Sequence, residues 1–348
     1  MSIGKRSSRL FSVLALVALV AVLMTAPALA KNENVKGKVV IYTSMYEDII
    51  EEVDRIISKE FPNLEVVFFY GGTGTLQAKI AAELDTGKLG CDMLMVAEPS
   101  YSLELQELGL LHPYLTPARE NLLFEYDPEG YWYPVRVCNM VLAYNPELYS
   151  LDEIPTSFYD FAYDKSVEGY ISMGNPLTSG TSMAAISALR DKYGYEYYEA
   201  LGDQKVMVES GSVALTKLET GECKVIMILE ESVLKKREEE GSELAVIYPD
   251  DGCIIIPSTI MTIAEEYSAN KNTEAAEAIT DWFLSEAGQA AIVKGWMHSV
   301  LKNTDLLPYD SIPTTQILEN TIPVDWEATY KEREEMRTKF EEAVKRAR

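Results

Sequence analysis

Short apolar runs alternate with segments whose apolar residues recur at helical spacing, and this alternation constrains the fold more than any other feature. Residues 38–42 have the pattern of a buried strand, and the apolar positions of residues 49–57 then fall on one face of a helix. A second strand is expected at 64–70, a second helix at 75–84 and a third strand at 93–97. Strands and helices in this order predict a mostly parallel sheet in an α/β lobe.

The same pattern restarts further along the chain. A strand-like run at 135–145 ends in Asn145-Pro146, a turn signal at which we expect the chain to pass into a second lobe. Strands are predicted at 169–173 and 225–229, with helices between them, and the run at 252–263 is placed to carry the chain back.

These segments predict two α/β lobes joined by two crossover segments. We expect residues 37–141 and 258–348 to form the first lobe and residues 142–257 to form the second. The first lobe would include a C-terminal helical region, because apolar residues repeat at helical spacing between Ala275 and Phe283 and a charged helix is predicted from about Trp326.

The first 30 residues have the features of a secretory signal peptide. Three basic residues between positions 5 and 9 precede an uncharged apolar run from Leu10 to Met24, and the segment closes on Ala28-Leu29-Ala30. A transmembrane anchor is disfavoured because the apolar run is shorter than the roughly 20 residues that span a bilayer. No lipid-anchoring cysteine follows, since the first cysteine is Cys91. We therefore expect cleavage after residue 30 and a free mature protein in the periplasm.

The chain is strongly acidic. It has 55 Asp and Glu against 31 Lys and Arg, a net charge of -24, and three of the basic residues lie in the predicted signal peptide. This charge argues against nucleic acid as a partner, because nucleic-acid binding depends on basic residues that neutralise phosphates. It does not exclude a small anionic ligand, which responds to donors inside a cleft more than to a distant, screened surface.

Cysteine and histidine are too few and too scattered to predict a metal or redox site. The four cysteines lie in or beside apolar runs, so buried thiols and disulfides both stay open, and no CxxC spacing occurs. We expect the two histidines to be structural, and we predict no cofactor and no metal. These residues are Cys91, Cys138, Cys223, Cys253, His112 and His298.

Four predicted strand-to-helix turns are rich in glycine, serine and threonine. Free backbone N–H groups and the positive end of the helix dipole meet at such turns, and in open α/β sheets ligands bind at this edge. Ordinary helix capping is the alternative for each turn, although the TSGTS run exceeds what a cap requires. Neither a Walker motif nor a nucleotide fingerprint is present. The candidate ligand-binding residues in these turns are Thr43, Ser44, Gly72, Thr73, Thr178, Ser179, Gly180, Thr181, Ser182, Ser210, Gly211 and Ser212.

Four strings, in their order and spacing, give the chain a family resemblance. They are VVIYTS at the first strand, NPLTSGTS, ESGSVALTKLETGE, and LSEAGQAAI near the end of the similar region, which runs from about Val39 to Lys302. On these strings the chain resembles the solute-binding proteins of ATP-binding-cassette (ABC) importers, particularly the branch of ferric-, phosphonate- and sugar-phosphate-binding proteins. The resemblance implies a type II periplasmic binding protein, with two lobes that close over a small-molecule solute and pass it to an inner-membrane ABC permease.

The chain departs from the ferric-binding members at two places. Those proteins usually have a His shortly after the first strand and a Tyr-Tyr pair after the strand that follows the GE motif. Met45-Tyr46 and Leu229-Glu230-Glu231 stand at these positions here. Tyr46, Tyr42 and Glu231 could still bind a hard cation through oxygen, so a ferric-binding protein stays the alternative.

The leading interpretation is an organophosphate-binding protein that acts as a monomer. Hydroxyls and N–H groups of the turns would hold the phosphate, and Glu230 or Glu231 would accept hydrogen bonds from the other end of the solute. Tyr46 and Glu231 therefore join the candidate ligand-binding residues. An exported hydrolase has less support, because GxSxG and HExxH motifs are missing and adjacent Glu230 and Glu231 on a strand would face opposite ways.

Several other residues have two interpretations. Tyrosines at predicted strand ends often line small-molecule pockets, but they also fill cores and rims. Arg136 pairs either with a phosphate or with one of the many carboxylates. The pair Tyr197-Tyr198 continues a helix, so we expect it to pack in the core. The strand-end tyrosines are Tyr42, Tyr46, Tyr70 and Tyr144.

Overall fold

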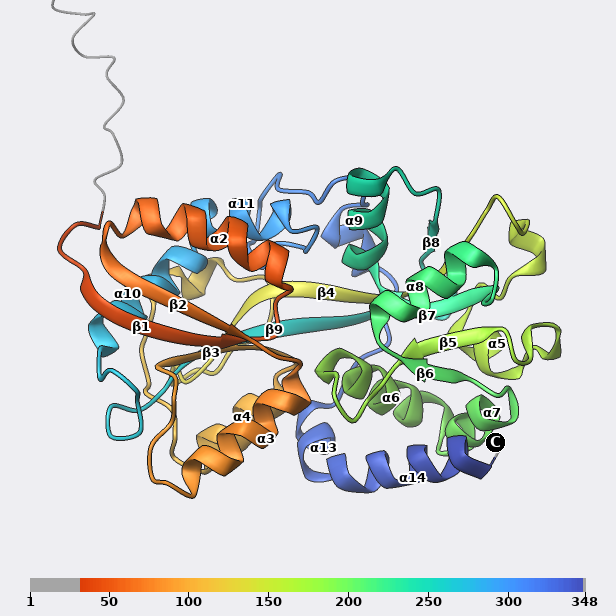
Figure 1. Ribbon diagram of the computed structural model, residues 1–348, viewed down its shortest axis with the longest axis horizontal. Helices are drawn as coiled ribbons and strands as arrows, with labels where there is room; N and C mark the ends of the chain where they lie inside the picture. Colours follow the sequence, from red (N-terminus) through yellow and green to blue (C-terminus); the bar gives the residue numbers. More distant parts are fainter. Residues whose placement is uncertain (1–31, 347–348) are drawn as a thin grey trace, which may run out of the picture.

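A single curved sheet runs through the protein and is covered by helices on its two faces (Figure 1). The computed structural model describes residues 32–346, so the predicted signal peptide lies outside the described residues. The strand order is β2-β1-β3-β9-β4-β7-β5-β6, with β8 paired to β4. The strands are β1 (Lys36–Thr43), β2 (Asn63–Tyr70), β3 (Met93–Ala97), β4 (Tyr133–Tyr144), β5 (Ile171–Gly174), β6 (Met207–Glu209), β7 (Val225–Leu229), β8 (Ala245–Ile247) and β9 (Ile254–Thr262).

The helices follow the predicted alternation. Within residues 32–346, no helix is both long and apolar enough to cross a membrane. The helices are α2 (Glu47–Glu60), α3 (Thr73–Leu84), α4 (Ser100–Glu107), α5 (Phe158–Tyr163), α6 (Gly180–Tyr193), α7 (Glu196–Asp203), α8 (Gly211–Thr220), α9 (Glu230–Glu240), α10 (Thr273–Phe283), α11 (Glu286–Lys294), α12 (Thr314–Ile317), α13 (Trp326–Lys331) and α14 (Arg333–Arg346).

Each lobe is an α/β sandwich built on parallel strands. In the first lobe β1 pairs in parallel with β2 and β3, with α2, α10 and α11 packed on one face and α3 and α4 on the other. In the second lobe β5 pairs in parallel with β6 and β7, with α6 and α7 on one face and α8 on the other. The α/β prediction is therefore confirmed.

Two long strands pass between the lobes and confirm the predicted crossovers. Strand β4 pairs antiparallel with β9 along its first part and with β7 along its last part, while β9 continues to β3. Figure 1 shows β4 and β9 side by side across the middle of the molecule. This is the type II arrangement, in which the lobes can rotate about the two crossover strands.

The last helix differs from the expectation that residues 258–348 all belong to the first lobe. Helix α14 packs along α7 and α6 of the second lobe. Its apolar stripe, which includes Met336 and Phe340, enters the same buried cluster as Tyr198. Arg333 at its start reaches back to Ser100 of the first lobe, at 3.0 Å. The helical spacing of the apolar residues explains why α14 packs on the second lobe. The rest of the lobe division stays a prediction.

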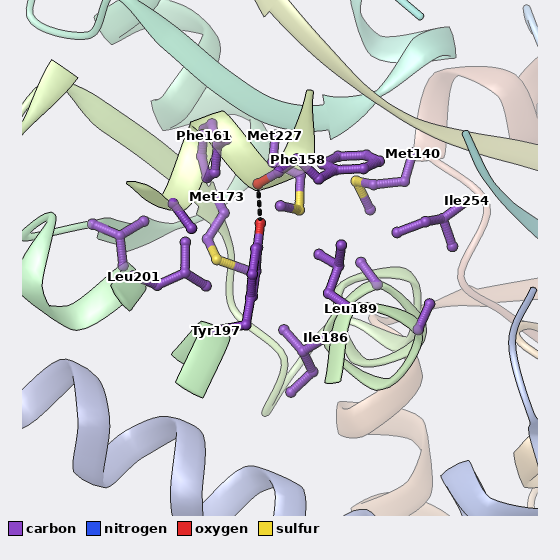
Figure 2. Packing of buried hydrophobic residues seen from close by; sticks show 14 of the residues in the cluster. Met140, Phe158, Phe161, Met173, Ile186, Leu189, Tyr197, Leu201, Met227 and Ile254 are labelled. Atoms are coloured by element: carbon purple, nitrogen blue, oxygen red, sulfur yellow. Dashed lines mark hydrogen bonds between the residues drawn. The ribbon is translucent and has the colours of Figure 1, made fainter. Parts of the chain in front are cut away.

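Tyr197 lies at the centre of the second-lobe core (Figure 2). Its ring is fully buried, and its hydroxyl donates a 2.7 Å hydrogen bond to the carbonyl oxygen of Phe158. Tyr198 is 1% exposed and donates to the carbonyl of Ile186. The tyrosine pair is therefore core packing, as its helical position predicted.

We expect Tyr197→Phe to lower the free energy of unfolding by about 1 kcal/mol, because it leaves the buried Phe158 carbonyl without its donor. Urea unfolding of the variant and the unmutated protein measures this. Tyr159→Phe is the matched control, since the Tyr159 side chain is half exposed. Equal destabilisation by the two substitutions would contradict a special role for the buried hydroxyl.

Candidate functional site

A cavity of about 320 Å³ lies between the two lobes, where the first turns of several helices meet. Helices α3, α6, α8 and α9 each contribute residues of their N-terminal turn, and the residue before α2 contributes another. The first N–H groups of a helix have no partner within it, and the helix dipole makes that end positive. This end of each helix favours an anion, so the arrangement is suited to a negatively charged group.

The structure brings together all but two of the candidate residues predicted from sequence. Thr43 is buried in β1, where its hydroxyl accepts a hydrogen bond from the N–H of Met45, so its neighbour Ser44 faces the cavity instead. Ser212 is exposed on α8 and does not line the cavity. The candidates that line it are Ser44, Tyr46, Gly72, Thr73, Thr178, Ser179, Gly180, Thr181, Ser182, Ser210, Gly211 and Glu231.

Two of the serines also cap helices. The Ser179 hydroxyl accepts a hydrogen bond from the N–H of Ser182 at the start of α6, and Ser210 caps α8 in the same way. The Thr181 hydroxyl lies 3.0 Å from that of Ser179. Capping therefore explains Ser179 and Ser210, whereas Thr181 adds a hydroxyl that the cap does not need.

Glycines let the lobes approach each other beside the cavity. A Cβ atom on Gly72 would lie 2.7 Å from the carbonyl oxygen of Thr178, and one on Gly180 would lie 2.8 Å from the Thr73 hydroxyl. The N–H of Gly74 donates a 3.1 Å hydrogen bond to the same Thr178 oxygen. These glycines are required for contact between the lobes as well as for the turns.

Arg136 is the cationic group of the cavity, and its role could not be decided from sequence. It is 3% exposed, and its guanidinium donates to the Ser44 hydroxyl at 3.3 Å and contacts Met297 Sδ. Its Nε has no hydrogen-bond partner among the described residues, and no described carboxylate forms an ion pair with it. A buried guanidinium without an ion-pair partner is costly, so this arrangement favours an anionic ligand. In the sequence, the feature that could have indicated this role is a lone charged residue inside an apolar strand.

Glu231 is the buried acidic group of the cavity. It is 2% exposed, and its Oε1 has no partner among residues 32–346. Burial raises the pKa of its carboxyl to about 7, although the charge of Arg136 opposes the rise. A second carboxylate, Glu209, lines the cavity but forms an ion pair with Lys217.

The sequence interpretation assumed that Glu230 and Glu231 lie on a strand, and this assumption was wrong. They open α9, because β7 ends at Leu229. Successive helical residues differ by about 100° in direction, so Glu231 lines the cavity while Glu230 does not. The carboxylate of Glu230 instead accepts a hydrogen bond from the Asn139 amide at 2.6 Å.

Tyrosines at the strand ends divide into two groups. Tyr46 and Tyr70 line the cavity, whereas the Tyr42 hydroxyl donates to Glu83 at 2.9 Å and Tyr144 packs against the second-lobe core. Burial raises the pKa of Tyr46, so it stays a neutral phenol. Of the three oxygen donors considered for a hard cation, only Tyr46 and Glu231 therefore face the cavity. Among residues 32–346, no three His, Cys, Asp or Glu side chains are grouped as a metal site.

The cysteines and histidines hold structural positions. All four cysteines are free and buried, which decides between the thiol and disulfide alternatives, and Cys138 lines the cavity. Burial raises the pKa of the Cys138 thiol. His112 and His298 each contact a carboxylate at 2.9 Å.

We expect Glu231→Gln to stabilise the ligand-free protein much more at pH 8 than at pH 5. The folded-state pKa of about 7 lies above the ordinary value of 4.5, so folding takes up a proton between these values. At pH 8 the unmutated protein buries an ionised carboxylate, and the neutral amide removes a cost of up to about 3 kcal/mol. At pH 5 the folded-state carboxyl is protonated and most of the cost is gone.

Thermal unfolding midpoints of the two proteins at pH 5 and pH 8 measure this difference. Glu240→Gln, on the exposed end of α9, serves as the control and should show no such change with pH. A stabilisation by Glu231→Gln that is the same at the two pH values would contradict the raised pKa.

Comparisons with known proteins agree with this fold. Residues 96–317 match a family model described as "Bacterial extracellular solute-binding protein". An uncharacterized protein of Haemophilus influenzae is 23% identical in an alignment of 310 residues that covers 84% of this chain and 86% of that protein.

Solved structures of periplasmic binding proteins have the same fold. AfuA from Actinobacillus pleuropneumoniae, solved with exogenous fructose-6-phosphate bound, is 23% identical with a TM-score of 0.76, over 89% of this chain and 99% of AfuA. Iron-bound HitA from Pseudomonas aeruginosa is 19% identical with a TM-score of 0.74, over 88% of this chain and 99% of HitA. With its type II fold, its cavity between two lobes and a family match over most of its length, the chain belongs to the bacterial extracellular solute-binding proteins.

Proposed function

We propose that this chain binds a small organophosphate, a sugar phosphate or a phosphonate, in the periplasm and delivers it to an inner-membrane ABC permease. The observation that carries the proposal is Arg136, a buried guanidinium without a carboxylate partner among the described residues, beside converging helix N-termini. A phosphate or phosphonate offers the charge and the acceptor oxygens that these donors require. The hydroxyls of Thr73 and Thr181 would add further hydrogen bonds.

The other polar groups of the cavity favour a solute with a second, hydrogen-bonding end. Glu231 has a buried oxygen without a partner among the described residues, and Tyr46 and Ser232 line the same region. A carboxylate accepts hydrogen bonds from sugar hydroxyls or from an amine. This combination supports an organophosphate over inorganic phosphate alone.

Closure of the lobes would complete the binding site. The crossover strands β4 and β9 allow rotation between lobes, and the Gly74 to Thr178 hydrogen bond joins the lobes at the edge of the cavity. Excluding water would strengthen the interactions between Arg136 and a bound anion, because the local dielectric falls. In this proposal the permease recognises the closed form.

Ferric ion is the second candidate. Tyr46 and Glu231 place two oxygen donors in the cavity, and one of the similar structures is the iron-bound HitA. The buried positive charge of Arg136 in the same cavity opposes a trivalent cation that has no accompanying anion. The fructose-6-phosphate bound to AfuA belongs to the solute class that we propose here.

A thermal-shift screen discriminates between these candidates, because a ligand that binds the folded state raises the unfolding midpoint. We expect hexose phosphates or aminoethylphosphonate to raise it and ferric salts to leave it unchanged. An increase with iron alone, together with a visible charge-transfer band, would overturn the organophosphate proposal.

Arg136→Gln should weaken binding of the solute found in the screen by about 10- to 100-fold, because a hydrogen bond to a charged group contributes about 1.5–3 kcal/mol. Isothermal titration calorimetry measures the dissociation constants. Arg119→Gln, whose side chain lies outside the cavity, is the matched control. Replacing Ser179 and Thr181 with bulky apolar residues tests the α6 turn, and unchanged affinity there would remove the turn from the site.

A further inference from the structure

Glu230 is the centre of a buried hydrogen-bond network behind the wall of the cavity. Its Oε2 accepts from the Asn139 amide at 2.6 Å and lies 2.9 Å from His298 Nε2, and its Oε1 accepts from the hydroxyls of Tyr248 and Ser311, each at 2.5 Å. The carboxylate is 1% exposed. Burial raises its pKa, but the hydrogen bonds outweigh burial and hold the pKa below its usual range. Glu230 is therefore a fully satisfied, ionised group.

The four partners of Glu230 come from segments that are far apart in the sequence. Asn139 lies on β4, and Tyr248 follows β8. His298 pairs with Val137 of the same β4 through two backbone hydrogen bonds of 3.0 and 3.1 Å, and its Nδ1 lies 2.9 Å from the Thr314 hydroxyl. The network thus ties the first residue of α9 to the crossover strand and to the segment that follows α11.

The first turn of α9 has no side-chain cap, so the network of Glu230 is an additional anchor for this turn. The residue before the helix is Leu229, which makes no capping hydrogen bond. Glu231 and Ser232, the next two residues after Glu230, line the cavity. Any shift of the Glu230 carboxylate would therefore move the Glu231 carboxyl with it.

A buried carboxylate that holds a helix in place carries a large cost in desolvation free energy. An apolar residue of similar size would pack there without the desolvation cost, so a complete set of donors indicates a requirement for a defined position. Recognition of a solute depends on such a defined position, since a hydrogen bond weakens steeply when its atoms leave their preferred distance and angle.

We propose that Glu230 is a positioning residue for solute recognition: its network with Asn139, Tyr248, His298 and Ser311 fixes the first turn of α9 and so aims Glu231 at the non-phosphate end of the solute. This inference rests on the proposed function, because it assigns Glu231 to that end. Glu230 itself touches no ligand. Its effect on binding passes entirely through Glu231.

The inference predicts a selective loss of affinity in Glu230→Gln. The amide keeps the shape of the side chain but cannot accept the same hydrogen bonds, so the first turn of α9 loses its fixed position. A hexose 6-phosphate, which reaches Glu231, should bind about 10- to 50-fold more weakly. Inorganic phosphate, which we assign to Arg136 and the N-terminal turns of α3, α6 and α8 rather than to the turn of α9 that carries Glu231, should change by less than about 3-fold in a competition titration.

A double-mutant cycle separates positioning from a general structural role. If Glu230 acts through Glu231, the variant with Glu230→Gln and Glu231→Gln together should bind the hexose phosphate within about 2-fold of Glu231→Gln alone. Glu240→Gln, on the exposed last turn of the same helix, is the control and should bind like the unmutated protein. Ser311→Ala, which removes one donor, provides a milder variant if Glu230→Gln does not fold, and its loss should have the same selectivity.

The outcomes distinguish this inference from the proposed function. Equal weakening of hexose phosphate and phosphate, additive losses in the cycle, or no loss in Glu230→Gln would each overturn the positioning role while leaving organophosphate binding intact. If the unmutated protein binds no phosphorylated or phosphonate compound, the proposed function fails, and the positioning role fails with it.

Discussion

The antiparallel pairing of β4 with β9 is the interaction on which the rest of the structure depends. It joins the lobes into one sheet, and in our proposal the lobes rotate about it when they close over a solute. Side chains alternate along β4, so Arg136, Cys138 and Met140 line the cavity, while Asn139 points to the opposite side and donates to Glu230. One strand thus carries the cationic group of the cavity and an anchor of the network behind it.

Features that depend on neighbouring residues were predictable from the sequence. Apolar periodicity located the strands and helices, and glycine, serine and threonine marked the helix turns at the cavity because their chemistry there is local. The assumption that Glu230 and Glu231 lie on a strand was wrong because β7 ends at Leu229, as predicted, and α9 begins at the very next residue. Element ends are the least determined by periodicity, yet here they decide which carboxylate reaches the cavity.

Features that depend on distant residues were not predictable in the same way. The role of Arg136 depends on having no carboxylate partner among residues 32–346, and its contact Met297 lies 161 residues away. The role of Glu230 depends on His298 and Ser311. Likewise, the apolar stripe of α14 was visible in the sequence, but the surface that accepts it, on α7, was not.

The cavity holds two uncompensated groups of opposite charge, and this pairing restricts the solute more than either group does. Arg136 and Glu231 attract each other, but they form no ion pair, and burial outweighs the attraction enough to raise the pKa of Glu231 to about 7. A simple anion would satisfy Arg136 and leave a Glu231 oxygen unpaired, whereas a simple cation would do the reverse. Either simple ion therefore leaves one buried polar group of the cavity without a partner, at a cost of about 1–3 kcal/mol. The solute that we propose, with an anionic head and a hydrogen-bonding body, would remove both costs at once, so the selectivity of the site would arise from these two buried groups even though the protein is strongly acidic.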